Sequence, residues 1–67
     1  MLRIETECET DGRWLAEVPA LPGVMSYGET DAQARVKVTA LALRSVAERI
    51  ENGEPLPPEL AGMFAEA

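Results

Sequence analysis

The chain has 67 residues, with twelve acidic and six basic side chains, one cysteine and no histidine. A chain of this length has room for one domain with a small core. A lone cysteine excludes an intrachain disulfide, and the absence of histidine also excludes a zinc site of the usual Cys/His kind. Oligomerisation is therefore the expected source of additional stability.

The formal net charge of -6 bears on the kind of partner. An acidic chain is repelled by phosphate backbones and anionic lipid, so direct nucleic-acid binding is disfavoured. A basic protein partner is favoured, because opposite charges accelerate encounter. The first five residues have no apolar signal-peptide core, and no later run is long enough to span a bilayer. We therefore expect a cytoplasmic protein without membrane contact.

The first half of the sequence predicts three strands. Residues 2–8 alternate between uncharged and charged side chains, as a half-buried strand does. Asp11-Gly12 then predicts a tight hairpin with a type I′ turn. The second strand should end near Val18, because Pro19 cannot donate a ladder hydrogen bond and Pro22-Gly23 marks another turn. A third strand should cover residues 24–27. The expected inward side chains on the first two strands are Leu2, Ile4, Thr6, Cys8, Trp14, Ala16 and Val18.

A long helix should follow, from about Asp31 to Asn52. Thr30 and Gln33 fit a capping box at its start, and Gly53 fits the left-handed residue that ends a helix. At 3.6 residues per turn, the side of the helix that we assign to the core carries Ala32, Val36, Ala40, Leu43, Val46, Ala47 and Ile50.

The predicted fold class is α+β, a three-stranded antiparallel meander packed on one long helix in the order β-β-β-α. Residues 1–54 form this domain, and residues 55–67 form a Pro-rich tail. The tail is expected to be irregular or to contain a short helical turn anchored by Leu60 and Phe64.

A second apolar stripe on the helix, Ala34, Val38 and Leu41, falls nearly opposite the assigned core face. It is interpreted either as ordinary apolar surface or as the contact between subunits of a homo-oligomer, since small side chains permit close helix approach.

The sequence offers no catalytic constellation. Glu5, Glu7 and Glu9 place carboxylates on one strand face, but period-two spacing holds neighbours roughly 6–7 Å apart, too far to share one metal ion without help. A solvated strand face explains them better. Cys8 alternates inward and is expected to be a buried, inert thiol. The serines lack a histidine base. The chain is therefore expected not to be an enzyme and to hold no metal or cofactor.

The segment DGRWLAEVPALPGVMSYGETDAQA, residues 11–34, resembles the hallmark segment of HicB-type antitoxins of bacterial toxin–antitoxin systems. The matching elements are Asp11-Gly12, Trp14, Ala16, Pro19, Leu21-Pro22-Gly23, Ser26 and Gly28-Glu29-Thr30, with Gly53-Glu54-Pro55 after the helix.

The resemblance implies a partial ribonuclease H-like fold without catalytic carboxylates. It also implies an inhibitor that covers the active surface of HicA, a small basic ribonuclease toxin. Many family members carry a further C-terminal DNA-binding module, which is not expected here because the sequence stops soon after Pro55. Gln33-Ala34 stands where the family usually has Glu-Ala.

The leading hypothesis is thus a HicB-like antitoxin or interaction module that binds a HicA-like toxin. One alternative is a self-associating structural domain without a toxin, and another is a divergent metal-dependent nuclease. The toxin would bind the exposed sheet face, which is predicted to carry Glu5, Glu7, Glu9, Leu15, Glu17, Met25 and Tyr27.

Overall fold

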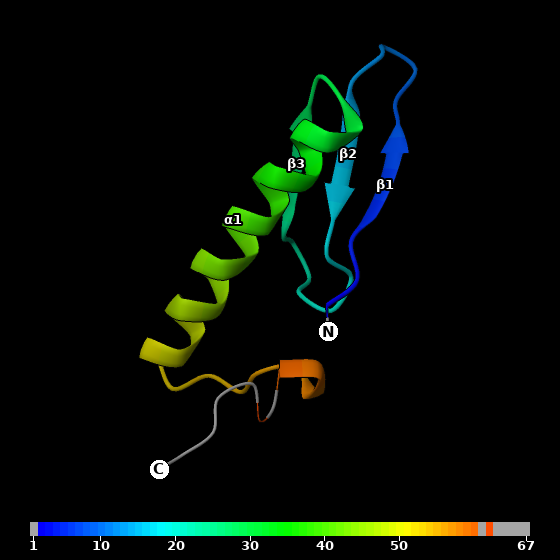
Figure 1. The fold of residues 1–67 in the computed structure, drawn as a ribbon. Coiled ribbons are helices and arrows are strands. Elements are labelled where there is room, and N and C mark those ends of the chain that lie inside the picture. The colour runs from blue at the N-terminus through cyan, green and yellow to red at the C-terminus, as the bar shows by residue number, and fades with distance from the viewer. Residues whose placement is uncertain (1, 61, 63–67) are drawn as a thin grey trace.

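The computed structural model describes residues 2–60 and residue 62. The elements follow one another as β1 (Glu5–Cys8), β2 (Trp14–Glu17), β3 (Met25–Gly28), α1 (Asp31–Glu51) and a 3-10 turn, η1 (Pro58–Leu60). The strands form one antiparallel sheet in the order β1-β2-β3, and α1 packs across one face of it (Figure 1). The predicted β-β-β-α class is therefore confirmed.

The connection between β1 and β2 has one residue more than a type I′ hairpin. The Glu9 amide donates to the Arg13 carbonyl (2.7 Å), and the Gly12 amide donates to the Glu9 carbonyl (3.0 Å). Only Gly12 has positive φ, at 89°, and Asp11 does not. The type I′ prediction was therefore wrong, because that turn needs positive φ at two positions, whereas a three-residue loop needs it only at its last residue.

The connection between β2 and β3 supplies part of the core. The Val24 amide donates to the Leu21 carbonyl (3.0 Å) around Pro22-Gly23, and Gly23 has φ 86°. Proline followed by a glycine at positive φ is the type II pattern. This turn directs the Leu21 side chain into the core. The buried core residues are Ala16, Val18, Leu21, Val24, Ala34, Val38, Ala42 and Leu60.

Both ends of α1 are satisfied by local hydrogen bonds. The Thr30 side chain accepts from the Gln33 amide (3.0 Å), as predicted, while Gln33 Oε1 accepts from the Glu29 amide rather than from that of Thr30. At the other end Gly53 has φ 71°, and the amides of residues 53 and 54 donate to the carbonyls of residues 50 and 49. This pair of bonds is a Schellman motif, which ends the helix where the sequence predicted.

The face of α1 that meets the sheet is not the predicted one. Ala34 and Val38 are fully buried against the strands, and Leu41 packs on the same core. Their assignment to an oligomer interface was therefore wrong. The residues assigned to the core are mostly on the solvent side: Ala32, Val36, Ala40, Leu43, Ala47 and Ile50 are exposed, and only Val46 packs on the core. Apolar residues occupy both sides of this helix, so periodicity alone could not choose between them.

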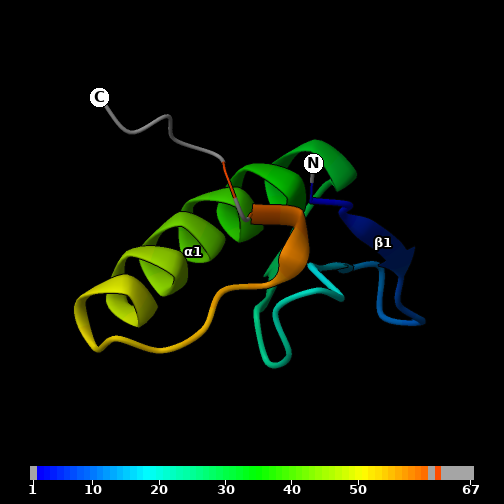
Figure 2. The ribbon, with the colours of Figure 1, turned by 90° about the horizontal axis from the view of Figure 1, so that it is seen from below.

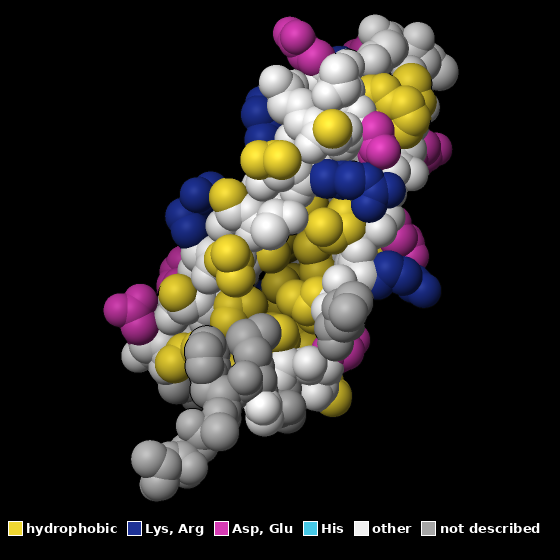
Figure 3. All heavy atoms as spheres, in the orientation of Figure 1, with side chains coloured by type: hydrophobic (Ala, Val, Ile, Leu, Met, Phe, Trp, Pro, Cys, Tyr) yellow, Lys and Arg dark blue, Asp and Glu magenta, His cyan; other side chains and the backbone are white. Residues whose placement is uncertain are grey.

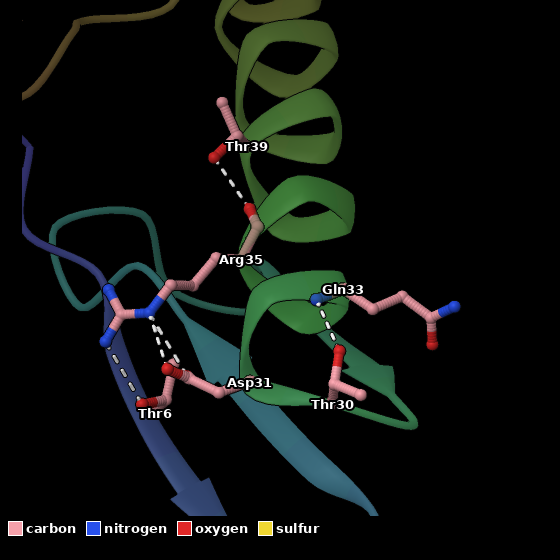
Figure 4. A network of polar contacts seen from close by, with 6 residues as sticks. All are labelled: Thr6, Thr30, Asp31, Gln33, Arg35 and Thr39. Carbon is pink, nitrogen blue, oxygen red and sulfur yellow. Dashed lines mark hydrogen bonds and ion pairs between the residues drawn. The ribbon is translucent and has the colours of Figure 1, made fainter.

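A polar contact crosses from α1 to the edge of the sheet. Arg35 Nε lies 3.1 Å from Asp31 Oδ1, and Arg35 Nη2 donates to Thr6 Oγ1 over 3.3 Å (Figure 4). Thr39 Oγ1 donates to the Arg35 carbonyl one turn further along the helix. The Arg35 guanidinium thereby connects the edge strand β1 to the first turns of the helix.

The helix is much longer than the strands. Its 21 residues span about 32 Å at 1.5 Å per residue, against about 13 Å for a four-residue strand. The second half of α1 therefore extends past the sheet. The segment after Gly53 runs back from the end of the helix to η1, which lies near the N-terminus (Figure 2). Leu60 in η1 is buried, as predicted, whereas Phe64 lies outside the described residues. Within the described residues, no helix has the length and hydrophobicity that a membrane crossing requires.

Candidate protein-binding face

The outer face of the sheet, opposite α1, brings together most of the residues predicted to contact a partner. The strand register sets Glu5, Glu17 and Met25 in one row across β1, β2 and β3. The next row on the same face consists of Glu7, Leu15 and Tyr27. Six of the seven predicted interface residues therefore form one contiguous surface two rows deep, which we call the outer sheet face.

Apolar side chains on the outer sheet face lie toward β3. Met25 and Tyr27 are large, and each exposes more than two-fifths of its surface (45% and 42%). Leu15, between Glu7 and Tyr27, is half-buried. Exposed Met and Tyr next to a partly covered Leu have the composition of an interface centre, where aromatic residues and Met are enriched.

Carboxylates on the outer sheet face lie toward β1. Glu5 lies directly across from Glu17, so two like charges form a cross-strand pair, an arrangement that weakens a sheet. Arg3 partly offsets this with an exposed ion pair to Glu5 (2.7 Å). Within the described residues, neither Glu7 nor Glu17 has an ion-pair partner. The β1 side of this face therefore carries uncompensated negative charge.

Arg13 lies at one end of the outer sheet face and holds Tyr27. Its guanidinium carbon is 4.3 Å from the centre of the Tyr27 ring, a cation–π contact, and its Nε is 2.7 Å from Asp11 Oδ2. The Asp11 side chain also accepts the Arg13 amide (3.0 Å). These two hydrogen bonds hold the pKa of Asp11 below its usual value. The bond from the Arg13 amide has the larger effect, and the bond from its guanidinium has the smaller one. The Tyr27 ring is thus supported from the hairpin loop.

The seventh predicted residue, Glu9, lies beyond the end of β1. Its backbone closes the hairpin loop with residues 12 and 13, and the residue is half-buried. Glu9 therefore lies opposite Arg13 at the loop end of the outer sheet face, next to the two rows that the strands form.

Cys8 also differs from its prediction, because the residue is exposed. The alternation correctly turns its side chain toward the helix side of the sheet, paired with Trp14. However, α1 packs chiefly on β2 and β3, so the end of the edge strand β1 stays uncovered. A strand pattern gives the direction of a side chain, but not whether another element covers it.

Two features of the surface were missing from the predicted sites. Arg13, which was not among the predicted site residues, contacts Tyr27 through its guanidinium group. Apolar residues on the outer side of α1 form a second exposed surface, and the sequence contained the signal for it in their regular spacing. Within the described residues, no group of three or more His, Cys, Asp or Glu side chains is placed to hold a metal ion. In comparisons with known proteins, no family model, curated protein or solved structure matches this chain.

Proposed function

We propose that this chain is a protein-binding module whose outer sheet face holds a small basic protein, and that this partner is a HicA-type ribonuclease toxin that the chain inhibits. The observation that carries the proposal is the composition of that face. Met25, Tyr27 and Leu15 form its apolar part, and the carboxylates of Glu5, Glu7 and Glu17 lie beside them in adjacent register positions.

The carboxylates support a cationic partner on energetic grounds. The Glu5–Glu17 juxtaposition costs the isolated sheet stability, and a hydrophobic or neutral residue at either position would remove that cost. A partner that brings lysine or arginine against these side chains turns the repulsion into charge complementarity. Complementary charge raises the association rate and selects the partner. The net charge of -6 acts in the same direction at long range.

The apolar part supports a protein as the partner. Exposed Tyr and Met side chains contribute binding energy when a partner buries them, and buried aromatic residues are frequent interface hot spots. The Arg13 guanidinium lies over the Tyr27 ring, and a contact that favours this orientation of the ring lowers the entropy lost on binding. The choice of a HicA-type toxin rests on the resemblance of residues 11–34 to HicB-type antitoxins.

The test begins with the neighbouring genes. A small basic open reading frame beside the gene for this chain would be co-expressed with it, and the pair purified through a tag on one member. We expect a stable complex in which ribonuclease activity of the basic protein is suppressed. A neighbouring product that neither binds nor is inhibited would contradict the proposal.

Two charge-reversal variants locate the surface. Glu7→Lys places a cation on the β1 side of the outer sheet face, beside Leu15, and Glu54→Lys makes the same change of charge after the helix, away from that face. We expect Glu7→Lys to weaken binding by more than about 30-fold, because a repelled charge replaces an attracted one at the interface. Glu54→Lys should weaken binding by less than about 3-fold through net charge alone. Equal losses would mean that binding depends on overall charge and not on this face.

A further inference from the structure

The side of α1 that faces away from the sheet carries a regular row of apolar residues. Intervals of four, three, four and three residues separate its members, which are Val36, Ala40, Leu43, Ala47 and Ile50. We call them the outer stripe. All five are exposed, and the three larger side chains leave 70%, 63% and 52% of their surface uncovered. Alternating intervals of three and four residues define the contact positions of paired helices in a coiled coil.

The chain itself has already used the opposite face of α1 for its core. Leu43, Ala47 and Ile50 instead line one wall of an open apolar groove of about 230 Å³, which is completed by residues that include Leu2 and Leu60. Figure 3 shows the hydrophobic surface along the helix and in the area between the helix and the sheet. Leu43, Ala47 and Ile50 thus belong to a continuous apolar area, and such surface on a small domain marks an association site.

Charges along one flank of the outer stripe indicate what covers it. Lys37 and Arg44 precede Glu48 and Glu51 along the helix, and all four lie on the same side of the stripe by helical geometry. Within the described residues, none of the four belongs to an ion pair. A partner helix running in the opposite direction, with the same sequence, presents its acidic end to this basic end and its basic end to this acidic end.

We propose that two copies of this chain pair through their outer stripes, with the two α1 helices antiparallel about a two-fold axis. A two-fold axis across antiparallel helices brings the same flank of both copies together, so Lys37 approaches Glu51 of the second copy and Arg44 approaches Glu48. Each contact occurs twice by symmetry. In this register Leu43 lies opposite Ala47 of the second copy, and Ala40 lies opposite Ile50, so Leu43 and Ile50 each meet an alanine. A parallel pair would set this charged flank against the uncharged side chains of Thr39 and Val46.

The pairing is independent of the outer sheet face, which stays free on each copy for another protein. The two surfaces lie on different faces of the domain, because α1 covers the inner face of the sheet and the outer stripe lies on the other side of the helix from the buried Ala34 and Val38. The dimer therefore presents two outer sheet faces pointing in different directions.

The first experiment measures the mass of the purified chain alone by sedimentation equilibrium between about 5 and 500 μM. We expect a reversible monomer–dimer equilibrium. Leu43→Glu should raise the dimer dissociation constant by more than about 30-fold, because it places a charge in the centre of the contact. Met25→Glu makes the same change at an exposed position on the sheet and should leave the constant unchanged. Circular dichroism of both variants checks that the fold is kept.

A charge exchange tests the antiparallel direction. Lys37→Glu and Glu51→Lys should each weaken the dimer by about 5-fold, because each creates two like-charge contacts. The double variant carries both changes and should return to the affinity of the unaltered chain. A monomeric chain at 500 μM, a dimer that Leu43→Glu does not affect, or a double variant no better than the single ones would each overturn the proposal.

Discussion

Gly28 in β3 lies directly against the backbone of Ala34 in α1. A Cβ atom added to Gly28 would stand 2.5 Å from the Ala34 amide nitrogen and 2.9 Å from its Cα. Real Cβ atoms do not approach backbone so closely, so the absence of a side chain at residue 28 lets the first turns of the helix settle on the sheet. Ala34 is fully buried as a result. This contact fixes which side of α1 faces the core.

Gly28→Ala should therefore destabilise the fold by about 1–3 kcal/mol, the usual cost of forcing an extra methyl into a packed site. The φ of Gly28 is not positive, so the cost comes from crowding and not from backbone strain. Urea denaturation followed by circular dichroism measures it. Gly12→Asn is the control, since Gly12 has open space around it and asparagine tolerates its positive φ. Equal stability of Gly28→Ala and the unaltered chain would contradict the close contact.

Two valines two residues apart test the orientation of the helix. Val38 is fully buried, whereas Val36 leaves 70% of its surface exposed. Val38→Ala should cost about 2 kcal/mol of unfolding free energy, because it removes buried methyl groups and leaves a cavity. Val36→Ala should change it by less than about 0.5 kcal/mol, since alanine favours helix and little packing is lost. Both are measured in dilute protein, where self-association does not contribute. The reverse order of effects would restore the helix face first predicted from sequence.

The local elements of this fold could be predicted because each depends on a few neighbouring residues. The turn at Pro22-Gly23, the cap at Thr30 and the helix end at Gly53 all lie where the sequence placed them. These same positions carry much of the resemblance to HicB-type antitoxins. They determine turns and helix ends and lie apart from the outer sheet face, so the resemblance concerns the fold more directly than the binding surface.

The face of the helix could not be predicted in the same way. The outer stripe contains Val36, Leu43 and Ile50, and it is as apolar as the side that packs on the sheet. Hydrophobicity therefore favoured the wrong side. The deciding factor was the close approach of Gly28 to Ala34, which needs small residues on both elements and depends on how they pack together. For the candidate site, alternation along the strands correctly gave the outward direction of six residues, but the contact between Arg13 and Tyr27 required the register between β2 and β3.

Thr30 and Thr39 lie in the same part of the chain with opposite consequences for the helix. Thr30 Oγ1 accepts the Gln33 amide, one of the amide groups at the start of α1 that have no partner within the helix. Thr30→Ala should therefore cost about 1 kcal/mol of unfolding free energy. Thr39 Oγ1 donates to a carbonyl inside the helix, so Thr39→Ala should be neutral or slightly stabilising. Thermal and urea unfolding of both variants compare them. A larger loss at Thr39 would contradict the capping role.

Asp11 gives the hairpin loop a pH dependence. The Arg13 amide and then its guanidinium hydrogen-bond the Asp11 carboxylate, and both lower its pKa from the ordinary value of 3.8. Because the pKa of Asp11 is lower in the folded chain than in the unfolded chain, the ionised carboxylate stabilises the folded loop fully at pH values above 3.8. This stabilisation decreases as the pH falls from 3.8 through the folded pKa. Asp11→Asn should remove this part of the acid sensitivity.

A variant at Arg13 distinguishes the effect of its amide on the pKa of Asp11 from the effect of its guanidinium. Arg13→Gln removes the guanidinium but keeps the backbone amide, which is the larger cause of the shift. We therefore expect the pKa of Asp11 to rise only part of the way to its ordinary value, as followed by carbon NMR titration of the carboxyl group. The loss of the cation should also free the Tyr27 ring, so its NMR signals should shift in the same variant. A complete return of the Asp11 pKa to its ordinary value would mean that the backbone amide does not hold the carboxylate.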